Sequence, residues 1–408
     1  MNGYQDKAVA GVAHAATRGA KRSRRWCLYG SAITTALALS ASVAQADPAA
    51  APAPTPMTTP AMEGPLTANP NPTSFDAGLG TIYVTGAVTG LAFLQTNPQH
   101  LAPGDGSSTF DFTNAQVSIQ KTDGLVQFYV QAGEYSLPSV GASYLKASTN
   151  TSATFGVVPV AYLKLQLSDT FSIQAGKLPT LIGAEYTFTT ENMNIERGLM
   201  WFQEPSISRG LQVNYASGPL SASLSLNDGY YSNRYNWLSG LVSYAFDSSN
   251  TLAFAGGGNL GKTDYGSFTA PENLNNGQVY NLIYTYNSSP WLINPYIQYQ
   301  HVDSDAALGL AEGSEWGFGV LANYALNANW NLSGRVEYET SSGADSLLLY
   351  GPKSKAWSFT LTPTYQNKLF FVRADASYTA VSNASFEFGK AFDKDSQARL
   401  MLEAGIVF

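Results

Sequence analysis

The sequence Gln397-Ala398-Arg399-Leu400-Met401-Leu402-Glu403-Ala404-Gly405-Ile406-Val407-Phe408 decides the fold, because its side chains alternate in character with a period of two. One face of this segment is wholly apolar and comprises Ala398, Leu400, Leu402, Ala404, Ile406 and Phe408. The other face carries the charges of Arg399 and Glu403. Successive side chains of a β-strand point to opposite sides, so the segment predicts a strand between an apolar and a polar environment.

The same alternation recurs in segments of about ten residues from residue 81 to the end of the chain. The predicted strands are 81–94, 109–121, 125–135, 157–167, 171–177, 208–216, 220–227, 237–246, 251–259, 278–286, 291–302, 314–326, 330–339, 356–366, 369–378 and 397–408. Aromatic residues concentrate at the ends of these segments, as girdles at two membrane interfaces would require.

The connections between the predicted strands alternate in length. Short turns are predicted at 122–124, 168–170, 217–219, 247–250, 288–290, 327–329 and 367–368. Longer polar stretches lie between them at 95–108, 136–156, 178–207, 228–236, 260–277, 303–313, 340–355 and 379–396. Bacterial outer-membrane barrels have short periplasmic turns and long outer loops. We therefore predict an all-β fold, a transmembrane antiparallel up-and-down β-barrel of about 16 strands over residues 79–408, wide enough for an aqueous channel.

The N-terminal region has the organisation of an export signal. A basic stretch at 21–25 precedes an apolar run at 26–43 and then Ala44-Gln45-Ala46, so we predict a Sec-type signal peptide over residues 1–46. Residues 47–78 are rich in Pro, Ala and Thr and predict a disordered periplasmic tail that serves as a spacer. A cell-wall-binding role for this tail is the alternative.

Composition excludes several function classes. The single cysteine, Cys27, lies within the predicted signal peptide, so the mature chain would have no disulfide and no thiol nucleophile. Residues 1–46 hold 6 of the 22 basic and 1 of the 29 acidic residues, which leaves a mature net charge of −12. The basic footprint of a nucleic-acid-binding protein is therefore absent. Charged residues form 12% of the chain, about half the usual share, as in a membrane barrel.

The sequence offers little for catalysis. After removal of the signal, only His100 and His301 remain as histidines, and both are interpreted as residues at the rim of the barrel. A hydrolase would need a nucleophile, a base and an orienting group together. We expect no enzyme activity, no catalytic or metal site and no cofactor.

The connection 178–207 is the longest and carries large apolar residues beside its charges. Leu181, Phe188, Met193, Leu199 and Trp201 are among the apolar ones. A loop folded into the lumen and packed on the barrel wall would need such anchors. We predict that it constricts the pore with Glu185, Glu191, Glu196 and Arg197. A surface flap or a subunit contact is the alternative.

Part of the chain resembles a known family. The segment Ala175-Gly176-Lys177-Leu178-Pro179-Thr180-Leu181-Ile182-Gly183-Ala184-Glu185 is similar to the Gly-Lys…Gly-x-Glu segment of OmpL-like outer-membrane porins of the β-barrel porin-2 type. The similarity continues through Arg197-Gly198-Leu199, Pro205, 209–213 and 227–231 and covers about residues 171–246. Ser208-Arg209-Gly210 departs from the His-Thr-Gly of the pattern. The resemblance implies a pore without fixing its solute.

The C-terminal strand also resembles the last strand of outer-membrane porins, whose terminal aromatic residue is part of the assembly signal. For this chain, the resemblance implies recognition of Phe408 by the barrel-assembly machinery. In general porins, the connection after the fifth strand is the constricting loop, and 178–207 holds that position.

The polar faces of the strands predict the lining of the lumen. The charged residues expected to point inward are Lys164, Arg335, Glu337, Glu339, Arg373, Asp375, Arg399 and Glu403. Arg335, Arg373 and Arg399 would form either a basic ladder opposite an acidic loop or a set of neutralised ion pairs. The sequence is compatible with both alternatives.

We predict an outer-membrane porin, exported by the Sec route, that lets small hydrophilic solutes diffuse passively. One alternative is a substrate-selective channel for sugars or organic acids with an aromatic track of Tyr230, Tyr231, Tyr235 and Trp237. Another is a non-conducting structural or adhesive barrel. The expected partners are outer-membrane lipid and lipopolysaccharide, the solutes and the assembly machinery, with no nucleic acid. A monomer and a homotrimer are both compatible with the sequence.

Overall fold

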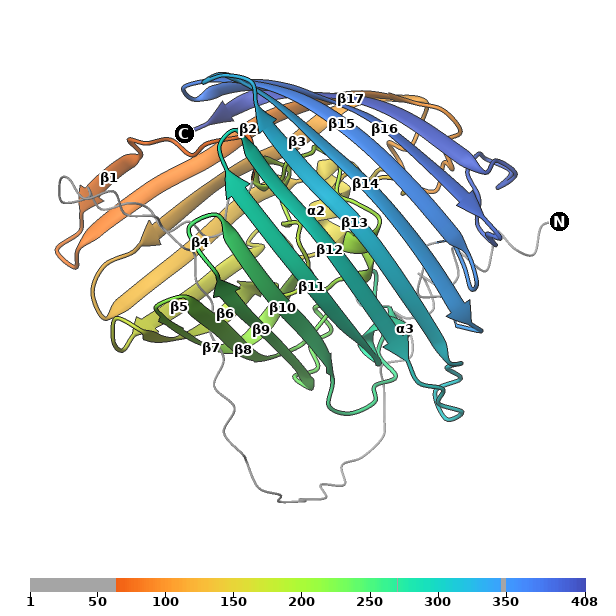
Figure 1. Cartoon of the computed structure of the whole chain (residues 1–408), viewed down its shortest axis with the longest axis horizontal. Coiled ribbons are helices and arrows are strands. Elements are labelled where there is room, and N and C mark those ends of the chain that lie inside the picture. Colours follow the sequence, from red (N-terminus) through yellow and green to blue (C-terminus); the bar gives the residue numbers. More distant parts are fainter. Residues whose placement is uncertain (1–63, 270, 346–349) are drawn as a thin grey trace.

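The computed structural model describes residues 64–269, 271–345 and 350–408 and shows a closed β-barrel (Figure 1). Its 16 antiparallel strands are β2 (Thr81–Gln95), β3 (Ser108–Lys121), β4 (Val126–Tyr135), β5 (Val160–Gln166), β6 (Phe171–Pro179), β7 (Ile207–Ser217), β8 (Leu220–Asn227), β9 (Trp237–Ala245), β10 (Asn250–Asn259), β11 (Gly277–Ser288), β12 (Trp291–Val302), β13 (Gly313–Ala325), β14 (Trp330–Gly343), β15 (Lys355–Asn367), β16 (Phe370–Ser382) and β17 (Ser396–Val407). Each strand pairs with the next, and β17 pairs with β2. The predicted all-β barrel of 16 strands is confirmed.

The connections alternate as predicted. Short turns join the strands at one end of the barrel, and long connections join them at the other (Figure 1). In the described part of the chain, the long connections contain four short helices, α2 (Ala147–Ala153), η1 (Thr189–Glu191), η2 (Met200–Gln203) and α3 (Glu272–Asn275). Within the described ranges, no helix has the length and apolar character to cross a membrane.

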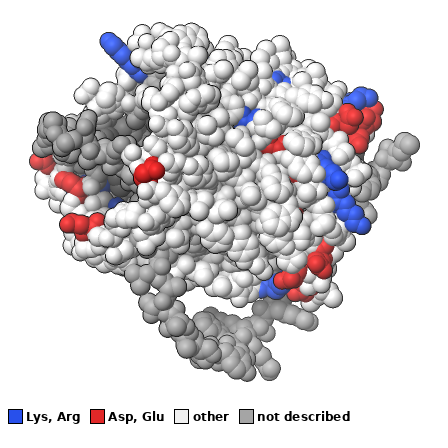
Figure 2. Space-filling model, viewed as in Figure 1, with Lys and Arg blue, Asp and Glu red and all other residues white. Residues whose placement is uncertain are grey.

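The two faces of the barrel wall differ in the way the alternation predicts. On β17, the apolar residues Leu400, Leu402 and Ile406 are exposed on the outside, while Arg399 and Glu403 are buried inside. Figure 2 shows that the outer surface over the strands is mostly free of charged residues, which gather toward the two ends of the barrel. Such an apolar belt is the surface that a transmembrane barrel presents to lipid.

Aromatic pairs border this belt on both sides. Near the short turns, Trp330 packs against Tyr365 with ring centroids 5.0 Å apart. Near the long loops, Tyr338 packs against Trp357 with centroids 4.5 Å apart. Trp330 and Tyr338 are eight residues apart on β14, which is roughly 27 Å along a strand. A tilt of about 35–45° reduces this to roughly 20 Å, close to the apolar band of about 25 Å in such barrels.

At the barrel seam, the backbone of Gly86 lies close to the ring of Phe408. The Phe408 N–H donates to the Gly86 carbonyl at 2.9 Å, and the Gly86 N–H donates to the Phe408 carbonyl at 2.8 Å. A Cβ on Gly86 would lie 2.6 Å from the Phe408 ring, so only glycine fits there. The terminal aromatic residue thus belongs to the closing strand pair.

Some strand ends differ from the prediction. β14 extends to Gly343 and β16 to Ser382, beyond the predicted ends at 339 and 378. In the sequence, polar residues end the apolar alternation at these positions. Strand pairing continues past the lipid, because the outer face of a strand need not be apolar there. In addition, β1 (Thr73–Asp76) pairs with β2, with Thr73 opposite Val84 and Asp76 opposite Thr81. These residues belong to the stretch 47–78 that was predicted as a tail, of which residues up to 63 lie outside the described residues together with the predicted signal peptide.

Candidate pore constriction

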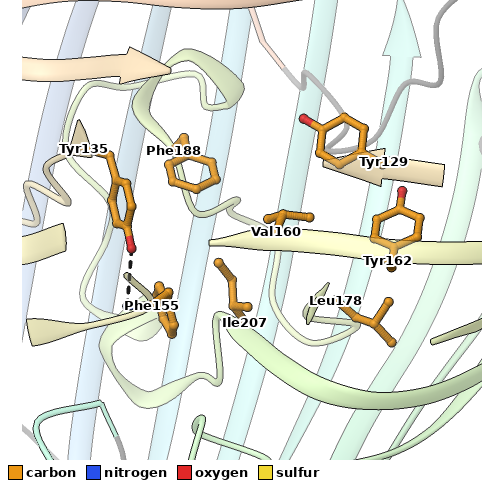
Figure 3. Packing of buried hydrophobic residues seen from close by; sticks show 8 residues of the cluster. All are labelled: Tyr129, Tyr135, Phe155, Val160, Tyr162, Leu178, Phe188 and Ile207. Carbon is orange, nitrogen blue, oxygen red and sulfur yellow. Dashed lines mark hydrogen bonds between the residues drawn. The ribbon is translucent and has the colours of Figure 1, made fainter. Parts of the chain in front are cut away.

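The connection between β6 and β7, residues 180–206, lies inside the barrel and is called the inward loop here. Its apolar side chains pack against inward-facing residues of several strands. Phe188 joins a cluster with Tyr129 and Tyr135 of β4 and with residues of β5, β6 and β7 (Figure 3). Its ring centroid lies 5.1 Å from that of Tyr135 in an edge-to-face arrangement. This cluster fixes the first half of the loop to the wall.

Other anchors of the inward loop reach different parts of the wall. Ile182 packs with Tyr230 and Trp237, and Ile195 packs with residues of β2 and β17. Met193 and Met200 join a cluster with residues of β11, β12 and β13. The apolar residues that predicted a loop packed on the wall therefore make such contacts, around much of the circumference.

Arg335 of β14 ties the wall to the inward loop by an ion pair. Its Nη1 lies 2.6 Å from Oε1 of Glu185 and also donates to the Glu196 carbonyl at 2.6 Å. Its Nε lies 3.1 Å from Oε2 of Glu337, close enough for an ion pair but without hydrogen-bond geometry. All three charged side chains are buried. Burial makes this network costly to break at one partner.

Arg373 and Arg399 make the same kind of contact on the neighbouring strands. Arg373 Nε donates to Glu403 at 2.7 Å, and its Nη atoms donate to the carbonyls of Thr189 and Asn192 in the loop. Arg399 Nη1 donates to Glu196 at 2.6 Å. Each of the three arginines thus has a carboxylate partner. The arrangement agrees with the alternative of neutralised ion pairs and not with a ladder of free cations.

Carboxylates of the wall and loop also cap backbone N–H groups of the inward loop. Asp375 accepts from the Glu196 N–H at 2.8 Å, and Glu337 accepts from the Leu199 N–H at 3.0 Å. Glu185 accepts from the Gly198 N–H at 2.6 Å. Irregular backbone inside a barrel needs such partners, because an unpaired buried N–H is costly.

Three of the predicted residues stand apart from this ion-pair network. Glu191 is buried and accepts from the Phe188 N–H at 3.0 Å, and loss of hydration raises the pKa of this carboxyl to about 8. Arg197 is also fully buried, which lowers the pKa of its guanidinium to about 10, and its Nη2 donates to the Pro138 carbonyl at 2.9 Å. Lys164 is half-buried on β5, opposite Gln127 and Gln174.

Uncharged residues that the sequence analysis did not single out complete the contacts. Gln298 donates to the Met200 carbonyl at 3.3 Å and Gln300 to the Gln203 carbonyl at 3.1 Å, both from β12. Thr189 donates to Glu403 at 2.7 Å. The alternation of β12 already gives Gln298 and Gln300 inward parity, but uncharged polar residues are common on that face and do not stand out in the sequence. Nothing in the local sequence marks Thr189.

The four aromatic residues proposed as a track do not line one path. Tyr230 and Trp237 are buried against each other, with ring centroids 5.4 Å apart, and Tyr230 donates to the Gln203 carbonyl. Tyr231 lies under the guanidinium of Arg209 at 3.9 Å. Tyr235 is exposed. Tyr230 and Trp237 pack against Ile182 of the inward loop, and Tyr231 packs against the cluster that contains Phe188, whereas Tyr235 belongs to neither cluster.

A closed 16-stranded barrel with an apolar belt, aromatic girdles and a charged interior defines an outer-membrane channel of the porin class. Residues 81–408 match the family model described as "Putative beta-barrel porin-2, OmpL-like", and the chain belongs to this family. It is therefore an outer-membrane protein that forms a channel. The predicted family, fold, function class and localisation are confirmed.

Solved structures share this fold at low sequence identity. OmpT, an outer membrane protein of Vibrio cholerae, is 12% identical with a TM-score of 0.54, covering 83% of this chain and 100% of that one. An anion-selective porin from Comamonas acidovorans is 12% identical with a TM-score of 0.54, covering 80% and 99%. The channel DcaP of Acinetobacter baumannii is 12% identical with a TM-score of 0.52, covering 82% and 99%. No curated protein sequence matches the chain.

Proposed function

We propose that the channel serves passive diffusion of small hydrophilic solutes, with the inward loop as its constriction. The observation that carries this proposal is the fixing of a charged loop inside the barrel by Arg335, Arg373 and Arg399. A polar lumen narrowed by fixed charges admits small hydrated solutes and disfavours apolar ones. The residues proposed to form the constriction are Glu185, Glu191, Glu196 and Arg197.

The proposal includes no catalysis and no cofactor. We also propose that the predicted signal peptide directs export, that the outer belt contacts lipid and lipopolysaccharide, and that the assembly machinery recognises Phe408. A homotrimer is the proposed assembly, since a neighbour of the same fold is described as a trimer form. Cross-linking of the protein in detergent tests this assembly directly.

Planar-bilayer recording of the purified mature protein tests the channel proposal. We expect ohmic steps that are not blocked by sugars or organic acids. Block by one such solute would favour the substrate-selective alternative, and absence of current from every form of the protein would favour the structural barrel. Excision of residues 183–203 should raise the unitary conductance if the inward loop forms the constriction. Unchanged conductance after excision would contradict that role.

A further inference from the structure

The chain on the N-terminal side of β1 runs into the periplasmic mouth of the barrel. Thr67 donates from its backbone N–H to Gln366 Oε1 at 2.8 Å, and Gln366 Nε2 donates back to the Thr67 carbonyl at 2.9 Å. Gln366 is buried on the inward face of β15, next to the short turn that leads to β16. This double hydrogen bond fixes the backbone of residue 67 at the inner wall.

The next residue inward fills an apolar patch of the lumen. Leu66 is 2% exposed and packs against Phe371 of β16 and Val407 of β17. Both wall residues have the inward parity of Arg373 and Glu403, so they are apolar groups on a face that is otherwise polar. Without Leu66, these two side chains would face water, which is unfavourable for groups of this size.

Gly64 reaches the inward loop itself. A Cβ on Gly64 would lie 3.0 Å from the Met193 backbone N and 3.1 Å from the Asn192 carbonyl oxygen. Its φ of +146° is a conformation that favours glycine. The backbones of Gly64 and the inward loop therefore touch. Asn192 in turn accepts a hydrogen bond from Arg373, so the contact lies where the wall holds the loop.

Residues 64–67, called the lumenal segment here, thus contact β15, the β16–β17 pair and the inward loop. We propose that the lumenal segment is a tethered blocker that narrows the periplasmic half of the pore and braces the inward loop. This proposal rests on the proposed channel function. β1 holds the C-terminal side of the segment at the barrel rim, so the blocker remains at high local concentration and can leave its site without leaving the protein.

A reducible cross-link tests the proposal in the full mature chain. The variant carries Thr67→Cys and Gln366→Cys, whose present side-chain oxygens lie 3.2 Å apart. The only natural cysteine, Cys27, lies in the predicted signal peptide. A bis-methanethiosulfonate reagent should link the two new cysteines. The matched control pairs Thr67→Cys with Asn367→Cys, because Asn367 is exposed and neighbours Gln366.

We expect the linked form to conduct at the wild-type level and reduction to raise the unitary conductance about twofold, because a freed segment widens the periplasmic half of the pore and no longer braces the inward loop. Deletion of residues 47–67 should give the same increase. The control pair should neither link nor change conductance on reduction. Equal conductance of linked, reduced and deleted forms would overturn the blocking role while leaving the channel function intact.

If the pair Thr67→Cys and Gln366→Cys does not link, the placement of the lumenal segment inside the barrel is wrong. Absence of current from every form would refute the channel function and the blocking role together. Heat-modifiable migration of the detergent-solubilised protein shows whether each variant has a folded barrel. If the deletion variant does not fold, the cross-linked variant, which retains the whole chain, still tests the blocking role.

Discussion

Arg335 illustrates how a single residue holds the interior together. Its guanidinium contacts Glu185 and Glu337 and the backbone of residue 196, all of them buried. Sequence parity placed Arg335 on the inward face, and that orientation is observed. The identity of its partner depends on the path of the inward loop across the lumen, which local sequence does not encode.

Replacement of Arg335 by Met should destabilise the barrel by about 3–5 kcal/mol, because two carboxylates would remain buried without their cation. Guanidinium-induced unfolding in detergent measures this loss. Lys355→Met, which removes an exposed cation from the adjacent strand, should have little effect. An Arg335→Met variant as stable as that control would show that the ion pair contributes nothing to the folded state.

Glu191 should make the packing of the inward loop depend on pH. Its pKa rises from an ordinary 4.5 to about 8 on folding, because burial disfavours the charged carboxylate. The folded state therefore binds this proton more tightly than the unfolded state. The stability that the protonated group contributes is complete below about pH 4.5 and is lost as pH rises through about 8.

We expect loop cleavage by a protease to accelerate between pH 6 and pH 9 in the wild type, at fixed protease activity. Glu191→Gln should remove most of that acceleration. Glu134→Gln, which alters an exposed carboxyl at the end of β4, serves as the control and should keep it. A Glu191→Gln variant with the wild-type pH profile would contradict the assignment.

At the scale of elements, the alternation of apolar and polar side chains predicted the strands, because strand pairing and contact with lipid both require it. Every predicted strand lies within an observed strand or overlaps one. A shift of one residue in the alternation would turn charged residues such as Arg373 toward lipid, so the alternation identifies the strands strongly. β1 was missed because four exposed residues at the rim carry no such pattern. The lumenal segment was missed for a related reason, since a single buried leucine, Leu66, gives no period.

Val336 tests the outer face of β14. It lies near the middle of the strand and is exposed on the apolar belt. Val336→Arg should cost about 2–4 kcal/mol, because a charge would face the hydrocarbon near its midplane. Val336→Leu keeps the apolar character and should be nearly neutral. Equal stability of the two variants, measured by unfolding in lipid vesicles, would mean that this face does not contact lipid.

At the scale of the whole molecule, the net charge of −12 that the predicted removal of residues 1–46 would leave predicts the ion preference of the channel. Fixed carboxylates raise the local cation concentration, and salt screens them over about 10 Å at 0.1 M. We expect mild cation selectivity at 0.1 M salt and nearly none at 1 M. Reversal potentials in a salt gradient measure this.

Replacement of Glu185 and Glu196 by Gln should shift the reversal potential toward anions, whereas Glu191, whose pKa is raised to about 8, contributes little charge at pH 7. Glu185 and Glu196 neutralise Arg335 and Arg399, so their loss leaves an excess of positive charge inside the barrel. Replacing the exposed Asp303 and Asp395 by Asn is a control for charge outside the lumen. If the reversal potential shifts only in the control variant, the charges that determine selectivity lie in the outer loops.

The seam between β2 and β17 also bears on how the barrel forms. Arg399 and Gln95, which share a hydrogen bond across it, are 304 positions apart in the chain. Every other strand pair of the barrel joins neighbours in sequence. Pairs between distant segments carry the largest loop-closure entropy, so the seam should form last and limit the folding rate. Until then, β2 and β17 are open sheet edges, and a nascent barrel in this state is prone to aggregate.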